Sequence, residues 1–305
     1  MRGRVLGMAV VSAVLLVAGG CADDGADTPT ARPTASISSP SPTSSHTSAP
    51  SGPSPSPSKP PALGTVPPPW LGTRVLPTTG DGYGEQRPTP PALRNRRFTL
   101  PDTLPMLPGT GFKAVVTDPA PAQVIARSTW APGCPVGASR LSWIRLTFRG
   151  FDGERHTGEL LVNSSVDDQL VEAFRALWDA DFPMEQLAIT TVAERDADPT
   201  GDGNGTGAFN CRPTTGGSSY SQHAYGLAVD VNPFQNPYVR SQNPYEKGDL
   251  VLPELATSYL DRAAVRRGMI TPDGPVVKAF AAIGWGWGGA WNSLKDYQHF
   301  SQNDR

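Results

Sequence analysis

The chain is poor in the residues from which several common functional sites are built. Its 305 residues include only three cysteines and four histidines. Basic runs are short, RNRR at 94–97 and RR at 266–267, and the net charge is −2. Nucleic acid is therefore a poor candidate partner, and we expect RNRR to be a solvated patch at a domain edge. No cysteine has a CxxC partner, which argues against a thiolate metal site.

The N-terminal residues have the pattern of an export signal. Arg2 and Arg4 precede VLGMAVVSAVLLVAGG, an apolar stretch that is short for a membrane span and ends in small residues. It stops at VAGGC, which resembles a bacterial lipoprotein processing site. We expect residues 1–21 to be a lipoprotein signal peptide and Cys21 to be lipidated, so that acyl chains anchor the protein outside the membrane. The alternative is an ordinary cleaved signal peptide in which Cys21 has no role.

The two remaining cysteines, Cys134 and Cys211, form an even pair in an exported, oxidising setting. This predicts a disulfide between them. The alternative is a pair of free, buried thiols.

Composition divides the rest of the chain into three parts. Residues 22–69 are Pro, Ser and Thr with almost no large apolar residues, so they cannot bury enough surface to fold and should form a disordered tether. His46 lies in this tether, and we expect it to have no role. Residues 70–127 contain apolar residues interrupted by prolines and predict an irregular extension. The compact domain is expected over 128–305.

The predicted domain has alternating strand and helix patterns. Residues 140–163 predict a β-hairpin with FDGE at its turn. Residues 164–183 predict a helix with Ser165 as its N-cap, 184–194 a further strand, and 275–284 a short helix. The first helix should bury the residues at helical spacing, namely Val166, Leu170, Phe174 and Trp178. This order favours an α+β class, an antiparallel sheet with a few flanking helices.

Three side chains are candidate metal ligands: His223, Asp230 and His299. Asp230 stands inside the apolar run LAVDV, where a lone carboxylate is costly unless a partner offsets its burial. Imidazole nitrogen and carboxylate oxygen suit zinc, and three protein ligands leave a fourth position open. Asp296 lies three residues before His299, so it could handle a proton while His299 binds the metal.

These motifs resemble a known family. SQHAYGLAVD, GWGWGGAW and DYQHF together are similar to the VanY-like zinc D-alanyl-D-alanine carboxypeptidases and L-alanyl-D-glutamate endopeptidases of bacterial cell walls. The resemblance runs from about Cys134 to Phe300 and implies the fold shared with the hedgehog signalling domain. It implies that zinc is the cofactor and that peptidoglycan stem peptides are the substrate.

The resemblance also implies roles for individual residues. His223, Asp230 and His299 would hold zinc, and Asp296 would be the general base and then the acid. Many members carry glutamate at that position, and aspartate is a shorter arm. Arg212 would polarise the scissile carbonyl or stabilise the oxyanion. Ser221 would contact the substrate or orient the site, or else be an ordinary turn residue.

Other conspicuous residues are expected to have structural rather than catalytic roles. The tryptophans of GWGWGGAW, namely Trp285, Trp287 and Trp291, are expected in wall and core, with one of them possible in the substrate cleft. His156 is expected to pack or to be exposed.

The whole sequence thus predicts a monomeric, lipid-anchored peptidase that faces the cell wall and touches the membrane only through its anchor. A D,D-carboxypeptidase is preferred over an L-alanyl-D-glutamate endopeptidase. A binding module with a structural zinc and, more remotely, a tethered small-ligand receptor are the rivals from other classes.

Overall fold

The computed structural model describes residues 61–80, 82–240 and 250–304. These residues belong to one compact unit that spans 58–305. The predicted signal peptide, Cys21, His46 and most of the predicted tether lie outside the described residues. None of the helices in the described part is long and apolar enough to cross a membrane.

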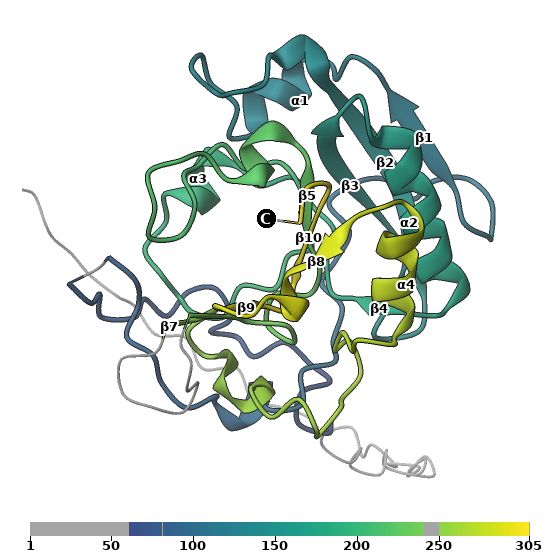
Figure 1. The fold of residues 1–305 in the computed structure, drawn as a ribbon. Helices are drawn as coiled ribbons and strands as arrows, with labels where there is room; N and C mark the ends of the chain where they lie inside the picture. The colour runs from purple at the N-terminus through teal and green to yellow at the C-terminus, as the bar shows by residue number, and fades with distance from the viewer. Residues whose placement is uncertain (1–60, 81, 241–249, 305) are drawn as a thin grey trace, which may run out of the picture. The chain divides into compact units, whose positions relative to one another are not determined.

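The largest sheet is built on the predicted hairpin, which the structure confirms (Figure 1). Strands β2 (Leu141–Gly150) and β3 (Arg155–Asn163) pair antiparallel along their whole length. Strand β1 (Ala114–Thr117) adds to β2 in antiparallel fashion, and β4 (Pro183–Met184) pairs in parallel with the end of β2. Alternate side chains of β2 are buried because one face of a strand can pack on the core.

Helices α2 (Asp167–Asp179) and α4 (Pro275–Ala282) lie side by side near this sheet (Figure 1). All four residues of the predicted α2 stripe are buried. The predicted N-cap was wrong, because Val166 is the N-cap residue and provides no side-chain cap. The Ser165 hydroxyl instead donates to the Asn163 side-chain oxygen at 2.8 Å, within the turn before the helix.

The strand predicted over 184–194 is much shorter than expected. Only Pro183–Met184 is β-strand, and the segment ends in helix α3 (Val192–Arg195). Thr191 and Glu194 form a reciprocal capping box, in which Thr191 N donates to Glu194 Oε2 at 2.8 Å and Glu194 N donates to Thr191 Oγ1 at 3.2 Å. This local cap favours a helical turn over an extended chain.

Residues 70–127, expected to be an irregular extension, contribute β1 and helix α1 (Ala122–Arg127) to the same compact unit. The end of the predicted tether also contacts it, since Arg97 N donates to Gly64 O at 2.8 Å. RNRR is not a solvated patch, because Arg96 is fully buried and pairs with Glu185. The sequence offered no sign of this burial, since the acidic partner lies 89 residues away.

Two small antiparallel sheets carry the residues of interest. One contains β5 (Ala228–Asp230), β10 (His299–Ser301) and β8 (Gly286–Trp287). The other contains β7 (Leu250–Leu252), β6 (Tyr238–Arg240) and β9 (Lys295–Asp296). Short 3-10 helices occupy Pro91–Leu93, Ala138–Arg140, Gln222–Tyr225, Ala256–Tyr259 and Gly288–Ala290. The result is a mixed α and β fold with antiparallel sheets and few helices, as the sequence predicted.

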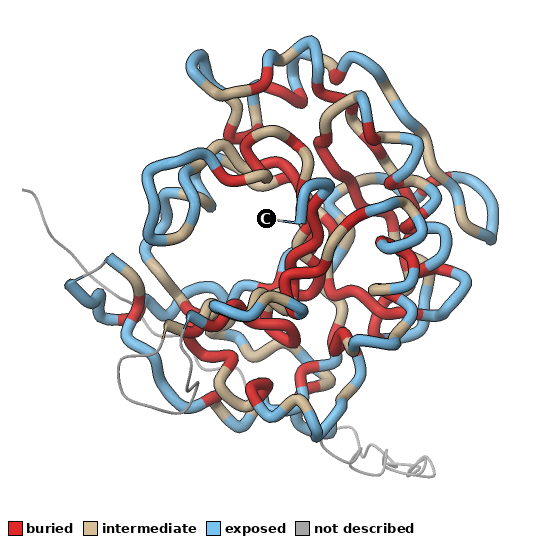
Figure 2. Tube along the Cα trace, in the orientation of Figure 1, coloured by how far each residue is buried: buried red, intermediate tan, exposed pale blue. Residues whose placement is uncertain are grey.

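Aromatic packing connects the helices to β10. Phe174 of α2 meets Phe280 of α4 edge-on, with ring centroids 6.3 Å apart, and Phe280 stacks on Phe300 at 4.2 Å. Phe300 is completely buried, and β5 and β10 run through the buried interior (Figure 2). Because His299 precedes Phe300, this packing fixes the position of the histidine.

Candidate metal and catalytic site

His223 is held by a short 3-10 helix, Gln222–Tyr225, that is defined at both ends. Ser221 is its N-cap, and the serine hydroxyl accepts a hydrogen bond from His223 N at 3.3 Å. Gly226 closes the turn with φ of 69°. A Cβ at this position would come within 2.5 Å of Asn163 N, so glycine lets the turn pack against the end of β3.

Asp230 and His299 come together through strand pairing. They are directly opposite each other in the antiparallel register of β5 and β10. Their neighbours Val229 and Phe300 are fully buried in the core, so the alternation of a strand turns Asp230 and His299 to the other face. This explains how a carboxylate can stand in the apolar run LAVDV.

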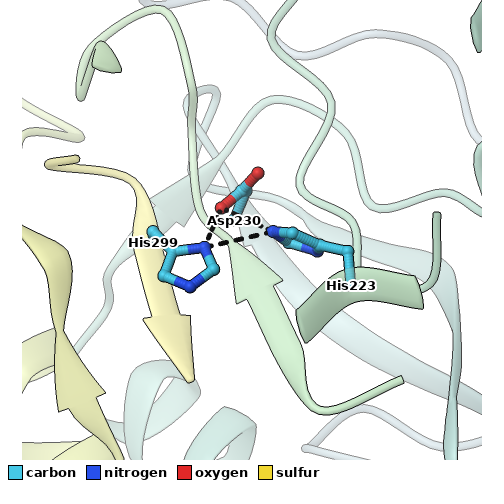
Figure 3. A group of neighbouring side chains, drawn as sticks. All are labelled: His223, Asp230 and His299. Atoms are coloured by element: carbon cyan, nitrogen blue, oxygen red, sulfur yellow. Dashed lines mark hydrogen bonds and ion pairs between the residues drawn. The ribbon is translucent and has the colours of Figure 1, made fainter. Parts of the chain in front are cut away.

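The three predicted ligands form one tight cluster (Figure 3). His223 Nε2 lies 3.2 Å from Asp230 Oδ1 and 3.1 Å from His299 Nδ1, and His299 Nδ1 lies 3.1 Å from Asp230 Oδ1. Ligand bonds of about 2.0–2.1 Å in a tetrahedral zinc site would place ligand atoms about 3.3 Å apart. The donor set and spacing therefore fit a zinc ion with three protein ligands.

The orientation of His223 also suits a ligand. Its Nδ1 lies 2.6 Å from Ala208 O, to which it can donate a hydrogen bond. A proton on Nδ1 leaves the Nε2 lone pair directed at the cluster, as is usual for metal-binding histidines.

The two histidines perturb Asp230. Burial acts to raise the pKa of Asp230, but the charges and hydrogen bonds of His223 and His299 outweigh it and hold that pKa below its usual range. The carboxylate thus remains ionised, which is the form that binds metal.

Asp296 lies beside this cluster with different properties. Burial, followed by the negative charge of Asp230, raises the pKa of Asp296 to about 7. Its Oδ1 is buried and has no hydrogen-bond partner among the described residues. A carboxyl group that titrates near neutral pH is suited to general acid and base chemistry.

Gly288, from the GWGWGGAW segment, allows Asp296 and His299 to lie close together. A Cβ at position 288 would come within 2.7 Å of Asp296 O and 3.3 Å of His299 Cβ. A side chain there would push the strand that carries Asp296 away from the cluster. The sequence had indicated this segment as wall and core, with one tryptophan in the substrate cleft, and had given its glycines no separate role.

Two neighbouring cavities adjoin the cluster, with volumes of about 410 and 440 Å³. Asp296, Arg212, Thr215 and Tyr238 line both of them. The cavity of about 410 Å³ is also lined by Ser221, His223, His299 and Trp291, and the cavity of about 440 Å³ is also lined by Asp230. A ligand in either cavity would therefore meet both Asp296 and Arg212.

Other predicted positions can now be placed. Trp285 and Trp287 are buried in the core, whereas Trp291 lines the first cavity. His156 lies away from the cluster, where its two ring nitrogens contact Asp102 and Asp152.

Sequence reasoning missed Tyr238. Its strand pairing with Asp296 places the two residues directly opposite each other. The short strand YVR carries no motif that could have indicated this, so only the fold shows it.

The predicted disulfide is present. Cys134 and Cys211 are joined with a Cα–Cα distance of 6.0 Å. The alternative of two free thiols is thereby excluded, and the residue next to Cys211 is Arg212.

The comparison with known families agrees with the motifs. Residues 215–302 match the model of a peptidase family described as D-alanyl-D-alanine carboxypeptidase. Over these residues the chain is similar to that family, in agreement with the VanY-like resemblance drawn from the sequence. The match includes His223, Asp230, Asp296 and His299, and it begins three residues after Arg212. No curated protein and no solved structure matched the chain.

Proposed function

We propose that this protein is a zinc metallopeptidase that removes the terminal D-alanine from peptidoglycan stem peptides. The observation that carries the proposal is the cluster of His223, Asp230 and His299 beside a buried Asp296, inside a segment that matches a peptidase family. His223, Asp230 and His299 would bind the ion. Zinc, when bound, acts as a Lewis acid that polarises a carbonyl group and acidifies water.

The remaining chemistry falls to two side chains of this chain. Asp296 would accept a proton from the water molecule that attacks the peptide carbonyl, and it would return that proton to the amine as the C–N bond breaks. Arg212 donates hydrogen bonds from its guanidinium to the carbonyl oxygen as negative charge develops there. Ser221 supports the site through the backbone of His223, to which its hydroxyl is bonded.

The choice of a D-alanyl-D-alanine bond rests on the description of the matched family. The protein would act outside the cytoplasm on the cell wall, as a monomer anchored by lipid at Cys21 and extended by its tether. A binding module that keeps zinc but has lost activity is the rival, and the raised pKa of Asp296 favours the enzyme.

The test uses residues 22–305, purified with one equivalent of zinc. Stem pentapeptides ending in D-Ala-D-Ala are incubated with this protein, and product masses are read. We expect loss of a single alanine residue, and Asp296→Asn should bind zinc equally but form product about 100-fold or more slowly. Cleavage between L-alanine and D-glutamate would change the assigned bond. If the protein binds zinc but forms no product, the hypothesis of a non-catalytic binding module would replace that of a peptidase.

A further inference from the structure

Residues 211–221 form a narrow antiparallel loop, called here the site hairpin. Ser221 N donates to Arg212 O at 3.1 Å, and Pro213 and Tyr220 pair as an antiparallel bridge. The site hairpin carries Arg212 at one end and ends one residue before the turn that holds His223. Six residues of this hairpin line the cavities at the cluster, namely Arg212, Thr214, Thr215, Ser219, Tyr220 and Ser221. Its position therefore sets one wall of the site.

The base of the site hairpin is attached to residues 129–134 at three points. The disulfide joins Cys211 to Cys134, and Cys211 N donates to Thr129 Oγ1 at 2.9 Å. On the opposite strand, the Tyr220 hydroxyl donates to Gly133 O at 2.8 Å. The two strands of the hairpin are thus fixed to the same loop, and the disulfide is the covalent part of this attachment.

The Arg212 side chain has little to hold it apart from its backbone. Within the described part of the chain, its guanidinium donates one hydrogen bond, to Pro213 O on the neighbouring residue, at 3.0 Å. Among the described residues no carboxylate forms an ion pair with it, although its charge acts on Asp296 from a longer distance. As far as the described residues go, most of its five donors are therefore available to a ligand. A long, unpaired side chain is placed mainly by the backbone that carries it.

We propose that Cys134 and Cys211 are positioning residues. Their disulfide holds the Arg212 guanidinium beside Asp296, where it can bind the carbonyl oxygen of the substrate. This inference rests on the proposed function and adds to it. A disulfide that merely stabilised the fold would lower the population of folded protein on removal, whereas this one sets the geometry of a group next to it in the chain. Misplacement by about 1 Å at such a group can cost about 100-fold in rate.

Hydrogen exchange tests the attachment without any need for activity. The variant Cys134→Ser/Cys211→Ser is compared with the parent, both loaded with zinc and held well below the Tm of the variant. We expect the backbone amides of the site hairpin to exchange about tenfold faster or more, while those of β2 and β3 are unchanged. Unchanged exchange in the site hairpin would overturn the proposal.

A double-mutant cycle tests the link to Arg212. The paired serine substitutions are made in the parent and in Arg212→Ala, and kcat/KM is measured for the stem-peptide bond that the parent cleaves. We expect a loss of about 10- to 100-fold in the parent, mainly in kcat. In the Arg212→Ala background the same substitutions should change kcat/KM by less than about twofold. The same large loss in both backgrounds would overturn the proposal.

Two further variants separate positioning from stability. Tyr220→Phe removes the hydrogen bond to Gly133 O on the opposite strand and should show the same dependence on Arg212, with a smaller loss. Ser142→Ala removes the hydrogen bond from Ser142 to Asp167, at the start of α2, and its effect on rate should be the same in both backgrounds. A parent that binds zinc but cleaves nothing would overturn the proposed function, and hydrogen exchange would still decide whether the disulfide fixes the hairpin.

Discussion

Replacement of Arg96 by methionine should destabilise the protein strongly, although Arg96 is far from the metal cluster in the sequence. Arg96 and Glu185 each expose only 1% of their side chains. Arg96 Nε lies 2.6 Å from Glu185 Oε2, and its second terminal nitrogen lies 2.5 Å from Glu185 Oε1. The guanidinium also donates to Asp202 O at 2.7 Å and lies over the ring of Phe234.

The magnitude follows from what the substitution leaves behind. Methionine can fill the space beside Phe234, but Glu185 would keep a buried charge without its cation. Loss of one member of a buried ion pair costs about 3–5 kcal/mol. Asn204 still donates to Glu185 Oε2 at 2.8 Å, so the glutamate is not left without any partner.

The double variant Arg96→Met/Glu185→Gln provides the comparison. Glutamine keeps the volume and the acceptor for Asn204 but carries no charge. The remaining defects are uncharged, namely the Asp202 carbonyl without its donor and the glutamine N–H groups without an acceptor, and an unsatisfied neutral group costs about 1–3 kcal/mol. We therefore expect the double variant to be more stable than Arg96→Met alone, a clear departure from additivity.

The assay is urea unfolding at pH 7, followed by tryptophan fluorescence, on residues 22–305 with zinc removed from every sample. A loss of less than about 1 kcal/mol for Arg96→Met, or a double variant less stable than the single one, would refute the reasoning. Arg87→Met is the matched control, since Arg87 is half exposed where it pairs with Glu85 and should contribute little.

Further expectations concern the site and the domain. His299→Ala should weaken zinc binding more than about 100-fold in competition with a chelating dye, whereas His156→Ala should not change it. Gly288→Ala should lower the free energy of unfolding in urea by about 1–3 kcal/mol and reduce activity, because the added Cβ would clash with Asp296 O. Gly111→Ala is the control and should be neutral, since a Cβ at position 111 has no atom within 4 Å. The metal-free protein should lose stability as the pH rises from 4 to 7. The pKa of Asp296 is about 7 in the folded protein and 3.8 in the unfolded chain, so the folded state binds this proton more tightly and loses that advantage as the pH rises. Asp296→Asn should lessen that loss in urea unfolding at pH 5 and 8, and an unchanged loss would contradict the pKa. A chain of residues 128–305 should fail to show a cooperative thermal transition that residues 58–305 retain, since it lacks β1 and Arg96.

The sequence alone predicted the parts of the protein that depend on local pattern. The β2–β3 hairpin and the α2 stripe followed from periods of two and 3.6 residues, because these periods decide which side chains face a core. The ligand set could be named because His223, Asp230, Asp296 and His299 occur at spacings that match a known family. The disulfide followed from there being just two cysteines left to pair.

The tertiary structure decided everything that depends on distant residues meeting. The burial of Arg96, the pKa of Asp296, the cavities shared with Tyr238 and the attachment of the site hairpin each join residues far apart in the chain. Their energies arise from desolvation and from charges brought within a few ångströms, and no short stretch of sequence carries that information. The motif thus identified the ligands, and the fold determined their 3.1–3.2 Å spacing and placed Arg212 and Asp296 in the lining of the same cavities.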